Sequence, residues 1–453
     1  MTRPFHAPDF SRKAGQLFLV SPDELRNAVR AMKAYPLIVS CLALPFLTLA
    51  DNWPSWRSDH LGSGRTAETN LPTKWGQEEN VRWRTELPEP GNSTPVIWGN
   101  HVYVTQPDSS NKSRNLLCFD RDSGKQLWKT GVIYEAEERS HRTNHFCSAS
   151  PAVNDERIVV SFGSAGLLCY DHNGKELWRR DFGAIDHAWG NSSSPVLFDD
   201  ILIHYHGPAT NAVLYGLNPE TGETVWEWEE PAWKPGERTD GFNDRPDQGI
   251  IGAFSTPILV ETDERRELIM SFPLEMKAFD PASGEILWTC SGLNPLVYTS
   301  PMYDDGVVVA MGGYYGNSIG VKVGGSGDVT ESHRLWQEVR HNGGIGSGIT
   351  KNGKLYYQDA GGIAYCDDMK TGKTLWRARL PGAGKSWGSF ITSGDLIYTL
   401  SQAGDTVVFK ASEKGLEVVS QAQVDEHTNS SLVVSNGQIF IRTHEALWCI
   451  GLE

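Results

Sequence analysis

The chain has 453 residues, with 16 Trp and 46 Gly, and its formal net charge at pH 7 is −15. A surface with this excess of acid repels nucleic acid and anionic lipid headgroups, so the composition argues against a polyanion-binding role. The seven Cys residues form no C-x-x-C or C-x-x-C-H motif, so they predict neither a redox pair, nor a metal site, nor an attached haem.

Residues 1–50 are predicted to be a leader that contains a signal peptide. An apolar run over residues 34–47 follows Met32 and Lys33, and small residues lead from it to Ala50. A charged start, an apolar middle and a small-residue exit are typical of a secretory signal, and the run is short for a membrane span. We expect translation to start at Met32, unless residues 1–31 are a long leader, and cleavage to occur near Ala50. The mature chain is then periplasmic or otherwise exported and has no transmembrane span; a buried strand or an uncleaved anchor is the alternative.

A lead-in segment over residues 51–77 precedes a phrase that recurs through the rest of the chain. Each copy runs from an apolar strand to Asp or Asn, then to Gly, and then along a second strand to Trp. Asp accepts hydrogen bonds from the backbone of a turn, and Gly tolerates a positive φ, so each copy predicts a β-hairpin. The outer strand is expected to be about three to five residues long. Full copies end at Trp128, Trp178, Trp226, Trp288 and Trp376, a weaker copy ends at Trp336, and half a copy ends at Trp83.

The repeated Trp is predicted to be an architectural residue. A large ring at the same place in every unit is best explained by packing against the neighbouring unit. The residues expected to dock blade on blade are Trp83, Trp128, Trp178, Trp226, Trp288, Trp336 and Trp376.

A second phrase precedes most hairpins: Ser or Thr, often Pro, and then two apolar runs separated by a polar turn, as in residues 150–160. Two hairpins per unit make a four-stranded antiparallel sheet, which is the blade of a propeller. The last unit ends without an outer strand, and residues 81–85 form a strand without a unit. We therefore predict an all-β, eight-bladed β-propeller over residues 78–453, closed by pairing of the N- and C-terminal strands. Seven blades is the alternative.

The hairpin phrase resembles the repeat of the pyrroloquinoline-quinone-like β-propellers, most clearly over residues 279–288 and 365–376. The resemblance covers roughly residues 80–453 and implies one of two branches. Quinoprotein dehydrogenases hold the quinone and Ca²⁺ on the central axis; other members are non-enzymatic scaffolds, such as the propeller lipoprotein of the outer-membrane β-barrel assembly machinery. This chain has no adjacent Cys pair and no haem-attachment motif, both of which many dehydrogenases carry, and their Ca²⁺ ligands map onto no position here.

Long polar links between consecutive blades predict a site at one mouth of the central channel, because loops on a rigid scaffold commonly carry binding residues. The His141 and His145 spacing fits two metal ligands on a helix, but the local sequence is typical of a loop, and we predict no metal site. Trp189 and Trp387 are candidates for stacking on a flat ligand or a sugar. The candidate ligand- or partner-binding residues are His141, Arg142, Asn144, His145, Asp186, His187, Trp189, Asn191, Asp240, Asp244, Arg245, Lys385, Trp387 and His427.

The sequence favours an exported, non-catalytic binding or assembly scaffold of the periplasm or cell envelope. We predict no catalytic residue and no cofactor, and we expect a monomer that binds an envelope protein or a small ligand, not nucleic acid. One alternative is an oxidoreductase that uses the quinone (PQQ) with Ca²⁺ on alcohols or sugars. Another is a carbohydrate-binding adaptor.

Overall fold

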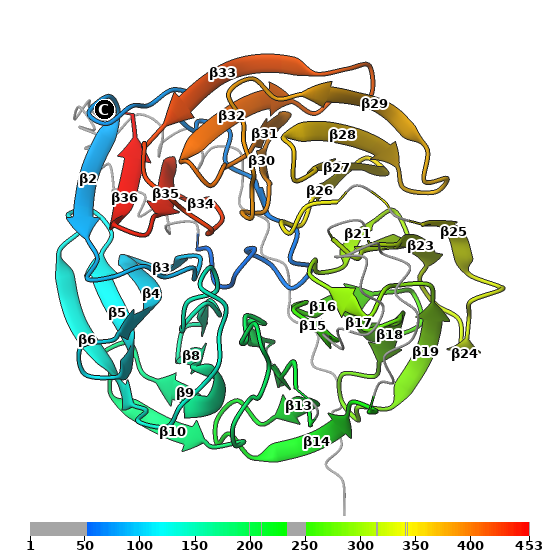
Figure 1. Ribbon diagram of the computed structural model, residues 1–453, viewed down its shortest axis with the longest axis horizontal. Helices are drawn as coiled ribbons and strands as arrows, with labels where there is room; N and C mark the ends of the chain where they lie inside the picture. Colours follow the sequence, from blue (N-terminus) through cyan, green and yellow to red (C-terminus); the bar gives the residue numbers. More distant parts are fainter. Residues whose placement is uncertain are drawn as a thin grey trace, which may run out of the picture. The chain divides into compact units, whose positions relative to one another are not determined.

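The computed structural model describes residues 52–198, 200–209, 211–232, 251–313, 316–339, 341 and 343–452. Within these ranges the chain is almost entirely β-structure, and the 3-10 turn η1 (Gly163–Ala165) is the only helical element. Eight sheets with four antiparallel strands each follow one another around a ring, which confirms the predicted eight-bladed propeller (Figure 1). No helix in the described ranges is long and apolar enough to cross a membrane. The predicted leader, residues 1–50, lies outside the described residues.

Blades 1 to 4 follow the chain from inner to outer strand. Blade 1 contains β3 (Val96–Trp98), β4 (His101–Asp108), β5 (Ser113–Asp120) and β6 (Gln126–Ile133). Blade 2 contains β7 (Ala152–Val153), β8 (Ile158–Ser161), β9 (Leu167–Tyr170) and β10 (Glu176–Arg180). Blade 3 contains β11 (Val196–Leu197), β12 (Leu202–His206), β13 (Val213–Leu217) and β14 (Thr224–Glu229). Blade 4 contains β16 (Ile258–Glu261), β17 (Arg266–Phe272), β18 (Glu275–Phe279) and β19 (Ile286–Ser291).

Blades 5 to 8 complete the ring. Blade 5 contains β21 (Met302–Asp304), β22 (Val307–Met311), β23 (Ser318–Lys322) and β25 (Arg334–Glu338). Blade 6 contains β26 (Ile349–Lys351), β27 (Lys354–Gln358), β28 (Ile363–Asp368) and β29 (Thr374–Arg379). Blade 7 contains β30 (Ile391–Ser393), β31 (Leu396–Tyr398), β32 (Asp405–Lys410) and β33 (Glu417–Gln423). Blade 8 contains β34 (Val433–Ser435), β35 (Gln438–Arg442), β36 (Ala446–Gly451) and β2 (Val81–Glu86).

Four short strands lie outside this pattern. β1 (Arg65–Thr66) pairs in parallel with β30, β15 (Gly252–Ala253) with β20 (Leu296–Val297), and β24 (Gly327–Asp328) with β19. Six of the eight outer strands have six to eight residues, more than the three to five expected, whereas β10 and β25 have five. For those six strands the expectation was wrong, because the outer strand continues past Trp where its inner partner still offers backbone groups to pair with.

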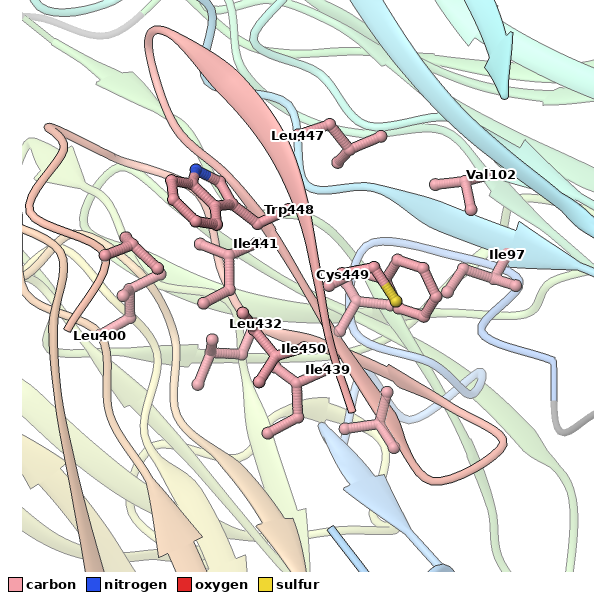
Figure 2. Close-up of a cluster of buried hydrophobic side chains, with 14 of the residues drawn as sticks. Ile97, Val102, Leu400, Leu432, Ile439, Ile441, Leu447, Trp448, Cys449 and Ile450 are labelled. Carbon is pink, nitrogen blue, oxygen red and sulfur yellow. The ribbon is translucent and has the colours of Figure 1, made fainter. Parts of the chain in front are cut away.

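The ring closes as predicted, through pairing of strands from the two ends of the chain. β2 pairs antiparallel with β36, with Trp83 opposite Cys449 and Glu86 opposite Ala446. Figure 2 shows the buried side chains at this seam, where Ile439 and Ile450 of blade 8 belong to one cluster with side chains of blades 1 and 7. Burial of these side chains from water stabilises the closed ring.

Six of the seven repeated Trp side chains reach the next blade. Each of the six indole N–H groups donates to a backbone carbonyl there over 2.7 to 3.2 Å. Trp226, for example, donates to Pro281, and a Cβ on Gly284 would come within 2.5 Å of its ring, so only Gly fits beneath it. Trp288 differs because a longer connection between β23 and β25, which contains β24, replaces the tight hairpin beside it. Its indole N–H donates to Glu267 of its own blade.

Candidate functional site

A closed ring of hydroxyl groups surrounds the central axis. One Ser or Thr from each blade stands just before the inner strand, and its backbone N–H donates to the hydroxyl oxygen of the next member over 2.8 to 3.1 Å. The members, in order, are Thr94, Ser150, Ser194, Thr256, Ser300, Ser347, Ser389 and Ser431, and the last donates to the first. All eight side chains are buried and line a cavity. We call them the hydroxyl ring.

A second tier lies two residues before each member of the hydroxyl ring and lines the same cavity. Its polar members come from blades 8, 1, 2 and 3 and are Asn429, Asn92, Ser148 and Ser192. Its apolar members come from blades 4, 5, 6 and 7 and are Phe254, Tyr298, Ile345 and Trp387. Because each group comes from four consecutive blades, one half of the wall is polar and the other half is mainly aromatic.

Three aromatic rings stack on the aromatic half. The ring centroids of Phe254 and Tyr298 are 5.9 Å apart with an interplanar angle of 8°, and Trp189 stacks on both at 6.4 and 6.1 Å. The parallel pairing of β15 with β20 holds Phe254 and Tyr298 in place, since these residues directly follow the two strands. The backbone N–H of Phe254 donates to the carbonyl of Val297 over 2.8 Å. Asn144 fixes the third, because its side-chain amide donates to the carbonyl of Trp189 over 2.7 Å.

The lead-in segment crosses the middle of the ring (Figure 1). It contacts the inner strands themselves, which follow the hydroxyl ring in the chain, and so lies at the end of the channel away from the second tier. Its backbone pairs with Ile97 of blade 1 at Trp53 and with Leu259 of blade 4 at His60. It then reaches blades 6 and 7, where β1 pairs with β30. These contacts with inner strands from both sides of the ring place the segment across the axis, and the side chain of Trp56 lines the cavity.

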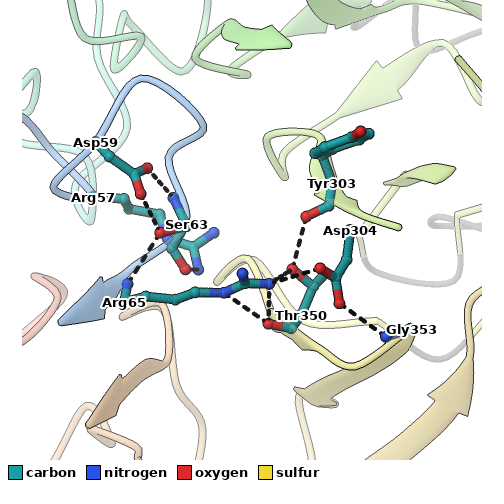
Figure 3. Close-up of polar contacts among 8 residues, drawn as sticks. All are labelled: Arg57, Asp59, Ser63, Arg65, Tyr303, Asp304, Thr350 and Gly353. Atoms are coloured by element: carbon teal, nitrogen blue, oxygen red, sulfur yellow. Dashed lines mark hydrogen bonds and ion pairs between the residues drawn. The ribbon is translucent and has the colours of Figure 1, made fainter. Parts of the chain in front are cut away.

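Arginine side chains anchor this floor (Figure 3). Arg57 is buried, its Nη2 donates to the carbonyl of Gly348 over 2.6 Å, and its Cζ lies 5.6 Å from the ring centroid of Trp56. Burial lowers the pKa of Arg57 to about 10, against the opposing charge of Asp59. Arg65 forms an ion pair with Asp304 over 3.3 Å. The two cations and two carboxylates named here leave this floor without net charge.

The result is a cup of about 320 Å³, which we call the axial cup. The lead-in segment forms its floor, the hydroxyl ring and the second tier form its wall, and Trp189 and His141 stand at its rim, with ring centroids 6.4 Å apart. Among its described lining residues there is no Lys, Arg, Asp or Glu, and the ionisable side chains are His141 and the phenol of Tyr298.

Four predicted site residues line the axial cup: His141, Asn144, Trp189 and Trp387. His187 lies behind the wall, with its ring centroid 5.5 Å from that of Phe254. Burial lowers the pKa of His187, so its imidazole is neutral at pH 7. Asn191 is engaged with the carbonyl of Gly207.

The remaining predicted residues that the structure describes do not line the cup. Asp186 forms an ion pair with Arg139, and Arg142 and Lys385 are exposed and do not line the cavity. His145 and His427 flank His444 at the seam, with ring centroids 5.1 and 4.6 Å from it. Asp240, Asp244 and Arg245 lie outside the described residues. His141 contacts Trp189 while His145 contacts His444, and the described residues contain no group of three side chains arranged to hold a metal ion.

Sequence reasoning missed the hydroxyl ring and most of the second tier. The Ser/Thr-Pro phrase was visible but was interpreted only as the start of a strand. Its hydroxyl and the residue two places earlier recur in every blade, and comparing those two positions across the eight units would have revealed both tiers. Trp56 gave no such signal, because it lies in a segment that does not repeat.

The family model of the outer membrane protein assembly factor BamB matches residues 112–378, which is more than half of the chain. The chain belongs to this family. BamB from Moraxella catarrhalis has a similar structure, with a TM-score of 0.56 and 14% sequence identity, covering 82% of this chain and 97% of that chain.

Two enzymes are also similar to this member of the BamB family. The quinohemoprotein alcohol dehydrogenase from Comamonas testosteroni has a TM-score of 0.63 at 12% identity, covering 89% of this chain and 81% of that chain. Tetrathionate hydrolase from Acidithiobacillus ferrooxidans is 22% identical over 206 residues, which are 43% of this chain. The match spans 39% of that relative's length. At these identities the structural likeness shows the fold alone.

Proposed function

We propose that the protein is an exported, non-catalytic binding scaffold of the periplasm or cell envelope, and that it holds a small ligand or a segment of a partner in the axial cup. The single observation that carries this proposal is the cup itself: one mouth, a floor made by the lead-in segment, and a wall with one polar and one aromatic half. Concave sites with an apolar wall and a few placed polar groups are the usual form of a ligand site. Membership of the BamB family supports a scaffolding role.

The quinone with Ca²⁺ is the second candidate, because a stack of near-parallel rings beside the axis suits a flat cofactor. The donor set fits it poorly. Ca²⁺ takes six to eight oxygen ligands, commonly carboxylates, and the described lining residues offer no carboxylate. The amide oxygen of Asn92 already accepts from Asn429 and pairs with the ring of His444. We therefore assign no step to the quinone.

Site-directed photo-crosslinking tests where the scaffold binds. A photoreactive amino acid would replace Arg142, which is exposed beside the mouth, or Asp155, which is exposed on the β7–β8 turn at the end where the lead-in segment lies. In the cells that naturally make the chain, we expect a defined crosslinked product from position 142 and none from position 155. Equal crosslinking from both positions would remove the support for a mouth-facing scaffold.

A dye-reduction assay tests the non-catalytic part of the proposal. The full chain is mixed with the quinone, Ca²⁺ and an alcohol or a sugar, and we expect neither retained visible absorbance nor dye reduction. Sustained reduction that requires both the quinone and the chain would make the protein an oxidoreductase.

A further inference from the structure

The hydroxyl ring presents a set of hydrogen-bond donors to the cup. Each of its oxygens accepts a backbone N–H from the preceding blade, as Ser150 does from Thr94 and Ser300 from Thr256. Among the described residues, none of the eight hydroxyls donates to a protein acceptor. All eight are more than nine-tenths buried, and a buried donor without an acceptor costs free energy. The cup therefore suits a ligand that has many acceptor oxygens, or water that such a ligand displaces.

The charge of the lining indicates that this ligand is neutral. No Lys or Arg is present among the described lining residues to pair with an anion, and no Asp or Glu to pair with a cation. The floor adds no net charge, because the positive charges of Arg57 and Arg65 are balanced by the negative charges of Asp59 and Asp304. The chain as a whole carries a net charge of −15, which further disfavours an anion.

The two halves of the wall indicate the shape of the ligand. Stacked rings such as Phe254 and Tyr298 cover a flat apolar face, while the polar half of the wall across the cup suits a polar edge. A pyranose has this pattern, because its axial C–H groups form an apolar face and its equatorial hydroxyls form a polar rim. A planar aromatic acid shares the flat face, but it would need a cation that the described lining does not offer.

We propose that the axial cup binds the terminal sugar of a neutral glycan, with one pyranose face on the aromatic half and its hydroxyls on the hydroxyl ring and the polar half. This inference rests on the proposed function, since it identifies the ligand class of the same site.

Saturation-transfer NMR and calorimetry on the full chain test this inference with cellobiose, maltose, lactose, mannobiose and N,N′-diacetylchitobiose. We expect at least one of these sugars to bind and its saturation to be strongest on the C–H groups of one ring face. Trp387→Ala should weaken the affinity for that sugar by roughly tenfold, whereas Trp387→Phe should keep most of the affinity. Tyr134→Ala removes a half-buried aromatic side chain outside the cup and should leave the affinity unchanged. If Trp387→Ala does not fold, Phe254→Ala provides the same test.

The outcomes separate the two proposals. If no sugar binds and crosslinking is still confined to position 142, the glycan inference is overturned and the proposed scaffold function stands. Binding of 2,6-naphthalenedicarboxylate in preference to every sugar would also overturn it, because that probe is flat but anionic. Sugar binding that is insensitive to both Trp387→Ala and Phe254→Ala would place the glycan elsewhere.

Discussion

The backbone N–H of Ser431 in blade 8 donates to the Oγ1 of Thr94 in blade 1 over 3.1 Å. These two residues are 337 positions apart, and their contact turns a chain of seven equivalent hydrogen bonds into a closed ring. Each blade is thereby fixed to its neighbours at the axis, while β2 and β36 join the same two ends of the chain at the rim. The hydroxyl ring that lines the axial cup is therefore complete only when the propeller is closed.

Thr94→Val tests the closing contact. Valine keeps the shape of threonine but removes the acceptor for the buried N–H of Ser431, and a buried N–H without a partner costs about 1–3 kcal/mol. We expect the free energy of unfolding, measured by urea denaturation, to fall by this amount. Thr374→Val makes the same replacement on the exposed outer strand β29, away from the axis, and should change stability by less than about 0.5 kcal/mol. Equal effects of the two variants would show that the contact contributes nothing specific.

Trp226→Ala tests the docking of one blade on the next. Trp226 is 8% exposed and packs over Gly284 of blade 4, so its removal leaves a cavity between two blades. We expect a loss of about 3–5 kcal/mol in the free energy of unfolding. Val225, the preceding residue on β14, is 56% exposed, and Val225→Ala should cost less than about 1 kcal/mol. Losses of similar size would argue against a docking role for the Trp.

The sequence predicted the features that a local pattern determines. Asp280 and Gly284 make a hairpin wherever they occur, because the carboxylate accepts turn N–H groups and the Gly adopts a φ of 74°. The strand at residues 81–85 lacked a partner in the sequence, which was enough to predict the closure. The aromatic half of the cup was only partly foreseen, since Trp189 and Trp387 stood out as unexplained Trp residues while Phe254 did not.

The floor of the cup could not be predicted in the same way. The lead-in segment is held by hydrogen bonds to backbone carbonyls, such as that of Gly348. Every residue has a backbone carbonyl, so the sequence does not show which one accepts. The spacing of His141 and His145 suggested a shared direction, but the loop carries the two rings to different neighbours, Trp189 and His444. A spacing rule holds only when the segment has the regular structure that the rule assumes.

Arg57→Ala tests the anchoring of the floor. The substitution removes the buried hydrogen bond to Gly348, and hydrogen bonds of charged groups contribute about 1.5–3 kcal/mol. We expect limited trypsin digestion to cut the lead-in segment, at Arg65 for example, much faster than in the unsubstituted chain. Arg82→Ala, an exposed substitution on β2, should leave the cleavage rate unchanged. Equal protection of the lead-in segment in both variants would mean that β1 and the other backbone contacts hold the floor without Arg57.

Acid should destabilise the propeller through two buried imidazoles on β12. His204 and His206 are each 2% exposed and both lie against Phe182, with ring centroids 5.4 and 5.6 Å from it. Burial lowers the pKa of His206 to about 4, although the charge of Asp181 opposes the change. Burial and the neighbouring His206 lower the pKa of His204 well below its usual value.

The sign of the pH dependence follows from these shifts. An unfolded His takes up a proton near pH 6.5, whereas His206 in the folded chain does so near pH 4. Between these values the unfolded state binds more protons, so stability falls as the pH drops, and above pH 6.5 the two groups have no effect. We expect the urea midpoint to decrease from pH 6.5 to pH 4. His206→Phe should flatten this part of the curve, since it keeps an apolar ring beside Phe182 without the proton-binding site; an unchanged slope would assign the acid sensitivity to other groups.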